Sequence, residues 1–182
     1  MIIFLKELRV RKNKAWGKFW SLNNVFKNKK SSLKSKMKIL ESCIMPVLSY
    51  GCQTWSLTKT QTSKLQSTQR AMERKIMGIR LKDRVSNRKL RESTQSKGIG
   101  AAIKKLKFKY ARHMFRMREE KWNRITTNWT PWGNKRGRGR LKTKWRDEIR
   151  NRVGASWKSI TQDREKWWRI GEAYAREWAD FM

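Results

Sequence analysis

The residues of this chain that could hold a metal or undergo redox chemistry are two cysteines and one histidine. Eight residues separate Cys43 from Cys52, whereas the cysteines of a zinc knuckle or a redox pair stand roughly two to four residues apart. A structural zinc ion takes about four Cys or His ligands, and His113 is the only histidine. The apolar neighbours Val47 and Leu48 instead indicate that both cysteines are buried packing residues, and we expect His113 at the core or its boundary.

Groups for acid–base or nucleophilic catalysis are equally sparse. A single histidine gives no clear Ser–His–Asp or Cys–His arrangement. Asp147 and Glu148 are adjacent, so their side chains diverge on a helix, and acidic residues are in any case favoured in a first helical turn. The sequence also lacks a glycine-rich phosphate loop. We therefore expect a chain that is not an enzyme on its own, with no catalytic residue, no metal and no cofactor.

Binding chemistry is better represented, above all in the segment KRGRGRLKTK from Lys135 to Lys144. Glycine lets the backbone approach an anion, while arginine forks onto phosphate oxygens. We interpret the segment as a phosphate-gripping loop; the alternatives are an A·T-rich minor-groove contact, a solvated basic loop or a nuclear-import patch. Trp129 and Trp132 beside it are candidates for stacking on bases.

The net charge identifies the class of partner. The chain has 47 Lys+Arg against 14 Asp+Glu, a net charge of +33. Such a surface suits a polyanion, so we expect RNA, DNA or an RNA/DNA hybrid as partner, and rank a membrane surface last. Residues 145–182 carry a net charge of +1, which leaves +32 on residues 1–144. The contact candidates are Lys27, Lys29, Lys30, Lys34, Arg70, Arg74, Lys104, Lys105, Lys107, Lys109, Arg112, Lys135, Arg136, Arg138, Arg140, Lys142 and Lys144.

The elements that position these residues are predicted to be helices. Apolar residues at helical spacing predict helices over 4–27, from 33 to a kink or end at Pro46, from Thr58 or Thr60 to Gly78, and over 99–118, 142–153 and 157–181. We predict an all-α fold, an irregular bundle of about five to six helices with a basic Gly/Arg loop and a Trp-rich C-terminal helix. The expected segments are an N-terminal basic helix (1–30), a helical core (31–125), the basic loop (126–144) and C-terminal amphipathic helices (145–182).

The N-terminal stretch MIIFLKELRV does not resemble a secretory signal, since its apolar run is short and no small-residue cleavage site follows. No stretch approaches the roughly 20 apolar residues of a membrane span. We therefore expect an intracellular protein, nuclear or cytoplasmic.

Five segments occur in a fixed order: CIMPVLSYGCQTWSLTK, KLQSTQRAMERKIMGIRLKDRVSN, LKFKYARHM, KWRDEI and DREKWWRIGEAYAREW. Together they closely resemble the region after the polymerase palm in reverse transcriptases of non-long-terminal-repeat retrotransposons, in particular the endonuclease–reverse transcriptases of animal genomes. The resemblance covers residues 9–178. It implies a helical thumb and C-terminal extension that grips template RNA and the growing hybrid.

The same resemblance implies what is missing. The catalytic Phe/Tyr-Ala-Asp-Asp motif and its magnesium belong to an upstream palm, and the endonuclease lies further upstream; this chain matches neither. It also lacks the ligands of the Cys/His knuckle that many relatives carry. Where relatives often read Gly-Arg-Pro after the basic loop, this chain reads Gly139-Arg140-Leu141, which weakens the minor-groove alternative.

The leading hypothesis is thus a retrotransposon-derived reverse-transcriptase fragment that is noncatalytic alone and binds RNA or DNA through a basic helical surface. The missing palm domain is its second expected partner. One alternative is an incomplete gene model of a full RNA-directed DNA polymerase and endonuclease, for which an upstream reading frame in frame with Met1 is the discriminating observation. A second alternative is a structural ribonucleoprotein or another non-specific nucleic-acid-binding protein.

Overall fold

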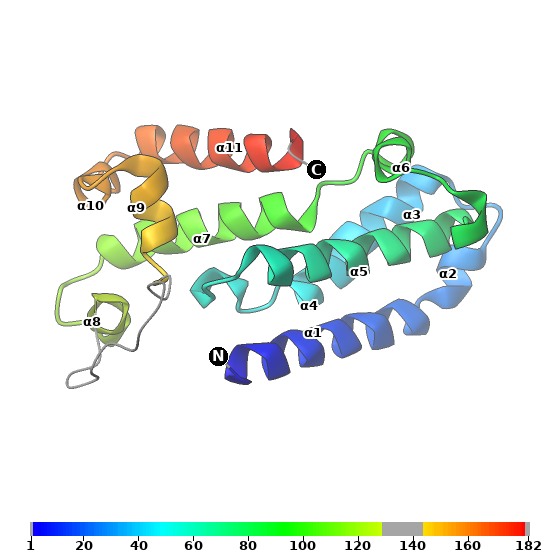
Figure 1. The fold of residues 1–182 in the computed structure, drawn as a ribbon, viewed down its shortest axis with the longest axis horizontal. Coiled ribbons are helices and arrows are strands. Elements are labelled where there is room, and N and C mark those ends of the chain that lie inside the picture. Colours follow the sequence, from blue (N-terminus) through cyan, green and yellow to red (C-terminus); the bar gives the residue numbers. More distant parts are fainter. Residues whose placement is uncertain (1, 129–143, 181–182) are drawn as a thin grey trace.

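Four long helices form the body of the computed structural model, which describes residues 2–128 and 144–180 (Figure 1). They are α1 (Ile2–Ser21), α5 (Lys59–Met77), α7 (Ile99–Phe115) and α11 (Arg164–Asp180). Helix α1 contacts α5, α5 contacts α7, and α7 contacts α11, so the four lie side by side in that order. No strand occurs in the described ranges, which confirms the predicted all-α fold.

Shorter helices connect these four: α2 (Asn23–Lys27), α3 (Leu33–Ile39), α4 (Met45–Leu48), α6 (Asn87–Thr94), α8 (Trp122–Asn128), α9 (Asp147–Val153) and α10 (Trp157–Ile160). The described residues are therefore divided more finely than the expected five to six helices. The helix predicted over 4–27 breaks at Leu22, and the one predicted over 157–181 is split by a turn that ends at Asp163. The Asp163 carboxylate accepts a hydrogen bond from the Lys166 N–H at 3.0 Å, which satisfies a free amide at the start of α11.

Pro46 widens a helix rather than ending it. Helix α3 runs into a π-helical turn, η1 (Leu40–Ile44), and then into α4, whose first turn contains Pro46. Proline cannot donate a hydrogen bond to the carbonyl four residues earlier. The hydrogen-bond ladder therefore shifts to the wider π register just before it.

The two cysteines, both predicted to be core residues, have different environments. Cys52 begins a 3-10 turn, η2 (Cys52–Thr54), and is fully buried, and burial raises the pKa of its thiol to about 12. Cys43 is exposed, so the prediction for it was wrong. Its neighbour Ile44 is the residue that faces the core, and successive helical residues point in different directions.

Helix α5 begins and ends at the residues that the sequence indicates. The Thr58 hydroxyl accepts a hydrogen bond from the Gln61 N–H at 3.2 Å, and the Gln61 side chain accepts one from the Thr58 N–H at 2.9 Å. This reciprocal pair is a capping box. Gly78 ends the helix with φ 71°, a left-handed conformation that glycine adopts without steric cost.

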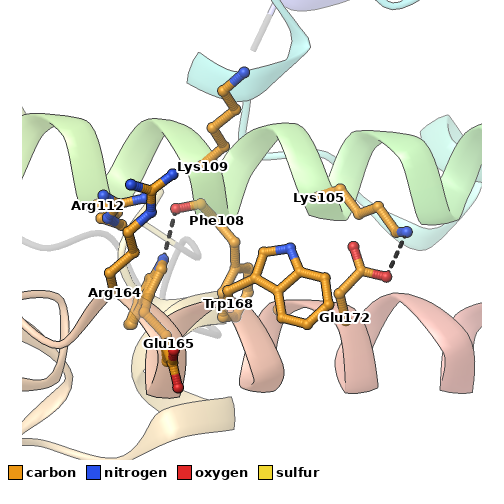
Figure 2. Close-up of a pocket in the computed structure, with 10 residues that line it drawn as sticks. Lys105, Phe108, Lys109, Arg112, Arg164, Glu165, Trp168 and Glu172 are labelled. Atoms are coloured by element: carbon orange, nitrogen blue, oxygen red, sulfur yellow. Dashed lines mark hydrogen bonds and ion pairs between the residues drawn. The ribbon is translucent and has the colours of Figure 1, made fainter.

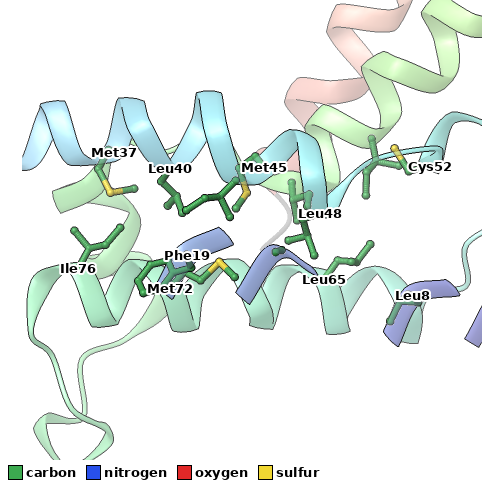
Figure 3. Close-up of a cluster of buried hydrophobic side chains, with 14 of the residues drawn as sticks. Leu8, Phe19, Met37, Leu40, Met45, Leu48, Cys52, Leu65, Met72 and Ile76 are labelled. Atoms are coloured by element: carbon green, nitrogen blue, oxygen red, sulfur yellow. The ribbon is translucent and has the colours of Figure 1, made fainter. Parts of the chain in front are cut away.

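The larger hydrophobic core lies where α1, α3, η1, α4 and α5 meet (Figure 3). Leu40, Leu65 and Met72 are fully buried in it, and Phe19 of α1 stacks on Phe26 of α2 with their centroids 4.8 Å apart. Burying side chains of this size contributes about 1.5–3 kcal/mol each. This core fixes α5 against α1.

A second core is aromatic and joins α7 to the C-terminal helices α9, α10 and α11. The rings of Phe108 and Trp167 stack at 5.0 Å, and Phe115 meets Trp157 edge-on at 4.6 Å. The Trp167 Nε1–H donates a hydrogen bond to the Phe108 carbonyl at 2.8 Å. The C-terminal tryptophans therefore do supply an aromatic cluster, whereas the predicted division into segments 1–30, 31–125, 126–144 and 145–182 stays a prediction.

A buried ion cluster ties α9 to α7 and α11. Lys107 of α7 is buried and donates from Nζ to Glu148 Oε2 at 2.7 Å, while Lys104 donates to Oε1 of the same carboxylate. The Tyr174 hydroxyl of α11 also donates to Oε1, at 3.3 Å. Desolvation favours the neutral acid, but the two ammonium charges and their hydrogen bonds outweigh it and lower the pKa of Glu148. One carboxylate therefore connects three helices.

Replacing Glu148 by Gln removes the carboxylate to which two buried ammonium groups donate. We expect the free energy of unfolding to fall by about 3–5 kcal/mol, measured by urea titration with circular dichroism. Glu165→Gln is the matched control, because it changes the net charge equally but removes an exposed pair with Arg169, worth about 0.2–1 kcal/mol. Equal losses in the two variants would contradict the proposed role of the buried cluster.

The same cluster predicts a loss of stability in acid. Because the pKa of Glu148 is lower in the folded state, the unfolded state binds the proton more tightly, and protonation favours unfolding. The stabilisation is fully present above the ordinary pKa of 4.5 and declines as pH falls through the lower folded-state value. The difference in unfolding free energy between wild type and Glu148→Gln should therefore shrink between about pH 6 and about pH 3. A constant difference across that range would show that Glu148 is not the ionised partner.

Candidate nucleic-acid interface

A groove runs along the seam between α7 and α11, with a cavity volume of about 720 Å³ (Figure 2). We call it the α7–α11 groove. It is lined by Lys105, Phe108, Lys109 and Arg112 of α7 and by Arg164, Glu165, Trp167, Trp168, Gly171 and Glu172 of α11.

Two adjacent tryptophans of α11 have opposite environments in this groove. Trp167 is 2% exposed and belongs to the second core, whereas Trp168 is 62% exposed. Successive helical residues point about 100° apart, so burying Trp167 turns Trp168 toward solvent. In Figure 2 the Trp168 ring lies between Lys105 on one side and Arg164 on the other.

Gly171 allows the two helices to come close together. A Cβ atom at this position would lie 3.3 Å from the Phe108 side chain, tighter than an ordinary carbon contact. A larger residue would therefore have to push α11 away from α7. The close approach places Trp168 and Arg164 opposite the cations of α7.

The charge of the groove is positive, with four cations against two carboxylates. One carboxylate, Glu172, is paired with Lys105 at 2.6 Å, and the other, Glu165, forms an exposed pair with Arg169 at 3.5 Å. The Arg112 Nε is buried and has no hydrogen-bond partner in the described part of the chain. A bound anion or water would satisfy such an orphan donor.

The α7–α11 groove continues past Lys105 into a second cavity, of about 360 Å³, which we call the α5–α6 extension. Its other cations are Arg70 of α5, Arg91 of α6, Lys97, and Arg176 of α11. Its carboxylate, Glu73, is buried, and desolvation raises its pKa despite hydrogen bonds from Ser96 and Gln69. The extension thus contains one carboxylate against five cations, counting Lys105.

The structure brings four of the predicted contact residues to this continuous surface: Lys105, Lys109 and Arg112 in the groove and Arg70 in the extension. Arg74 has a different environment. Its guanidinium donates to Asn87 Oδ1 at 2.7 Å and to the Val85 carbonyl at 3.3 Å. Arg74 therefore holds the start of α6 against α5.

Lys104 and Lys107 do not lie on the exposed surface expected of contact residues. They are 7% and 2% exposed, respectively, and both donate to Glu148. The reason is that α7 is buried on two sides, against α5 and η2 on one and against α9 and α11 on the other. We therefore correct their assignment as phosphate contacts.

The remaining predicted residues lie elsewhere or outside the described ranges. Lys27, Lys29, Lys30 and Lys34 are exposed around the turn between α2 and α3 and line neither cavity. Lys144 is exposed, and its backbone N–H donates to Asp147 Oδ2 at 2.6 Å. The candidates that fall outside the described residues are Trp129, Trp132, Lys135, Arg136, Arg138, Arg140 and Lys142.

Sequence reasoning missed several residues of this surface and misplaced one face of α7. Trp168 is not among the predicted stacking candidates, although the burial of Trp167 turns its immediate neighbour on the helix toward solvent. His113, expected at the core or its boundary, is exposed and adjoins the groove beside Lys109 and Arg112. The missed residues are Arg91, Lys97, Arg164, Trp168 and Arg176; for Trp168 the doublet Trp167-Trp168 was the available signal.

Within residues 2–128 and 144–180, no three side chains of His, Cys, Asp or Glu gather as a metal site would require. None of the helices there combines the length and the apolar composition needed to cross a bilayer.

Comparison with known proteins shows similarity to a transposon-derived protein. The chain is 28% identical over 179 residues to an uncharacterized transposon-derived protein of Caenorhabditis elegans. The match covers 90% of this chain but 63% of the relative, so the chain spans less than two thirds of the length of the protein it matches. No protein-family model matches the chain, and neither does any solved structure.

Proposed function

We propose that this chain binds RNA or DNA with little sequence preference, and that a strand lies along the α7–α11 groove. The observation that carries the proposal is the 62% exposed ring of Trp168 in a groove whose lining includes Lys105, Arg112 and Arg164. An aromatic face binds an unpaired base by stacking, while the neighbouring cations bind the phosphates on either side of it. Because bases in a duplex already stack on one another, this arrangement favours a single strand or a single-stranded segment.

The α5–α6 extension supplies a path for more than one nucleotide. A strand that stacks a base on Trp168 can continue past Lys105 toward Arg176 and Arg91. The two cavities together contain eight cations, with Lys105 counted once, against three carboxylates. This excess predicts binding by phosphate neutralisation and counterion release, so affinity should fall steeply with salt.

We also propose that the chain derives from a retrotransposon, specifically from the thumb and following region of a reverse transcriptase, and is noncatalytic alone. Its similarity to a transposon-derived protein supports the first part. The five ordered segments described above support the second. A polymerase palm, which in such enzymes holds the catalytic carboxylates and magnesium, is then a partner of this chain in addition to nucleic acid.

Replacing Trp168 by Ala should weaken binding of a labelled single-stranded RNA by about 1–3 kcal/mol, roughly 5- to 150-fold, because one stacked base is lost. Fluorescence anisotropy at a fixed salt concentration measures the change. Trp122→Ala is the matched control, since Trp122 is 78% exposed on α8 and does not line the groove. Equal affinities for the two variants would exclude Trp168 as the stacking platform.

A further inference from the structure

A second groove lies between α1 and α5, with a cavity volume of about 360 Å³. The charged residues that line it are Lys12 of α1 and Lys64 of α5. The α5 wall is otherwise made of small side chains, including Ser67 and Ala71, against which the Trp16 ring of α1 is set. We call it the α1–α5 groove.

An aromatic ridge extends this groove along α1. The rings of Trp16 and Trp20, one helical turn apart, stack with centroids 5.9 Å apart and planes 25° apart. Trp20 is 46% exposed, and the Lys75 Nζ of α5 lies 4.4 Å from the centroid of its ring. The α1–α5 groove, lined by Trp16, Lys12 and Lys64, and the Trp20–Lys75 pair one helical turn further along thus combine indole rings with cations, as the α7–α11 groove does.

The two grooves are separate. They share no lining residue, and α5 and α7 lie between them in the row of long helices (Figure 1). The α5–α6 extension also reaches α5, where Arg70 donates a hydrogen bond to Ser67 of the α1–α5 groove at 3.4 Å, but the extension and that groove likewise have no lining residue in common. A strand in one groove therefore does not occupy the other. The positive charge of the chain also counteracts the mutual repulsion of two phosphate backbones brought to its two sides.

We propose that the α1–α5 groove binds a second strand of single-stranded nucleic acid, so that one chain holds two strands at the same time. The proposal rests on the proposed function of the α7–α11 groove. One chain would then link two strands and hold them at a high effective concentration relative to each other.

The test is a two-strand recruitment assay with the full chain. One single-stranded RNA is immobilised, limiting chain is bound to it, and recruitment of a second, non-complementary, fluorescent single-stranded RNA is measured. The α1–α5 variant is Lys12→Gln, Lys64→Gln and Lys75→Gln. The matched control is Lys38→Gln, Lys82→Gln and Lys89→Gln, which removes the same charge from exposed positions outside both grooves.

We expect the α1–α5 variant to bind the first strand within about threefold of wild type but to recruit the second at least about tenfold less, because phosphate contacts are lost at one groove alone. The control variant should recruit like wild type. Replacing the same three groove lysines by Arg should preserve recruitment, because the charge is kept. Light scattering of the complex should give one chain with two strands.

Four results would overturn the proposal: no recruitment by wild type, unchanged recruitment by the α1–α5 variant, equal loss in the control variant, or a complex containing two chains. Failure of the proposed function is distinguished by a separate variant, Arg112→Gln, Arg164→Gln and Trp168→Ala. If the α7–α11 groove is a binding site, this variant binds one strand and fails to recruit the second, as the α1–α5 variant does. If this variant still recruits the second strand, the α7–α11 groove is not a binding site and the proposed function fails.

Discussion

Glu148 accepts a hydrogen bond from each of two buried lysines, Lys104 and Lys107, and the arrangement of the C-terminal half depends on it. Its negative charge offsets the cost of burying their ammonium groups. The same contact fixes α9 on α7, and Tyr174 adds α11 to the cluster. Once α11 is held along α7, Trp167 enters the core, and its neighbour on the helix must face the solvent. The exposed ring of the α7–α11 groove therefore follows from how the core is closed.

The uneven distribution of charge in the sequence has a structural explanation. Residues 145–182 contain half of the acidic residues, and their net charge of +1 suggests a segment with no electrostatic role. In the fold, Glu148 and Glu172 of this segment pair with lysines of α7, including Lys105. They neutralise lysines in the middle of α7 and leave the groove cations Lys109 and Arg112 in its C-terminal half. Glu148 and Glu172 thus determine which part of the basic helix α7 can serve as a binding surface.

Local signals in the sequence were sufficient for the helices and their caps but not for the surfaces. Helix α5 begins after Thr58, one of the two predicted start residues, and ends at Gly78 as predicted, because capping depends on a few neighbouring residues. The burial of α7 on two sides could not be predicted from periodicity, since it depends on which helices pack against it. For that reason Lys107, which is buried, is among the predicted contact residues, and the exposed Trp168 is not among the predicted stacking residues. The basic character of the interface was predictable from composition, whereas its position along the α7–α11 seam required the fold.

The measurement that most directly tests the proposed interface is photocrosslinking of the full chain to single-stranded RNA containing 4-thiouridine, with mass spectrometric mapping of the adducts. The account predicts adducts on α11 between Arg164 and Arg176 and on the facing part of α7 between Lys105 and Arg112, with the Trp168 peptide prominent. Adducts confined to other segments, such as the exposed lysines from Lys27 to Lys34, would contradict it. In that case the chain would bind nucleic acid through its charge alone, without the groove.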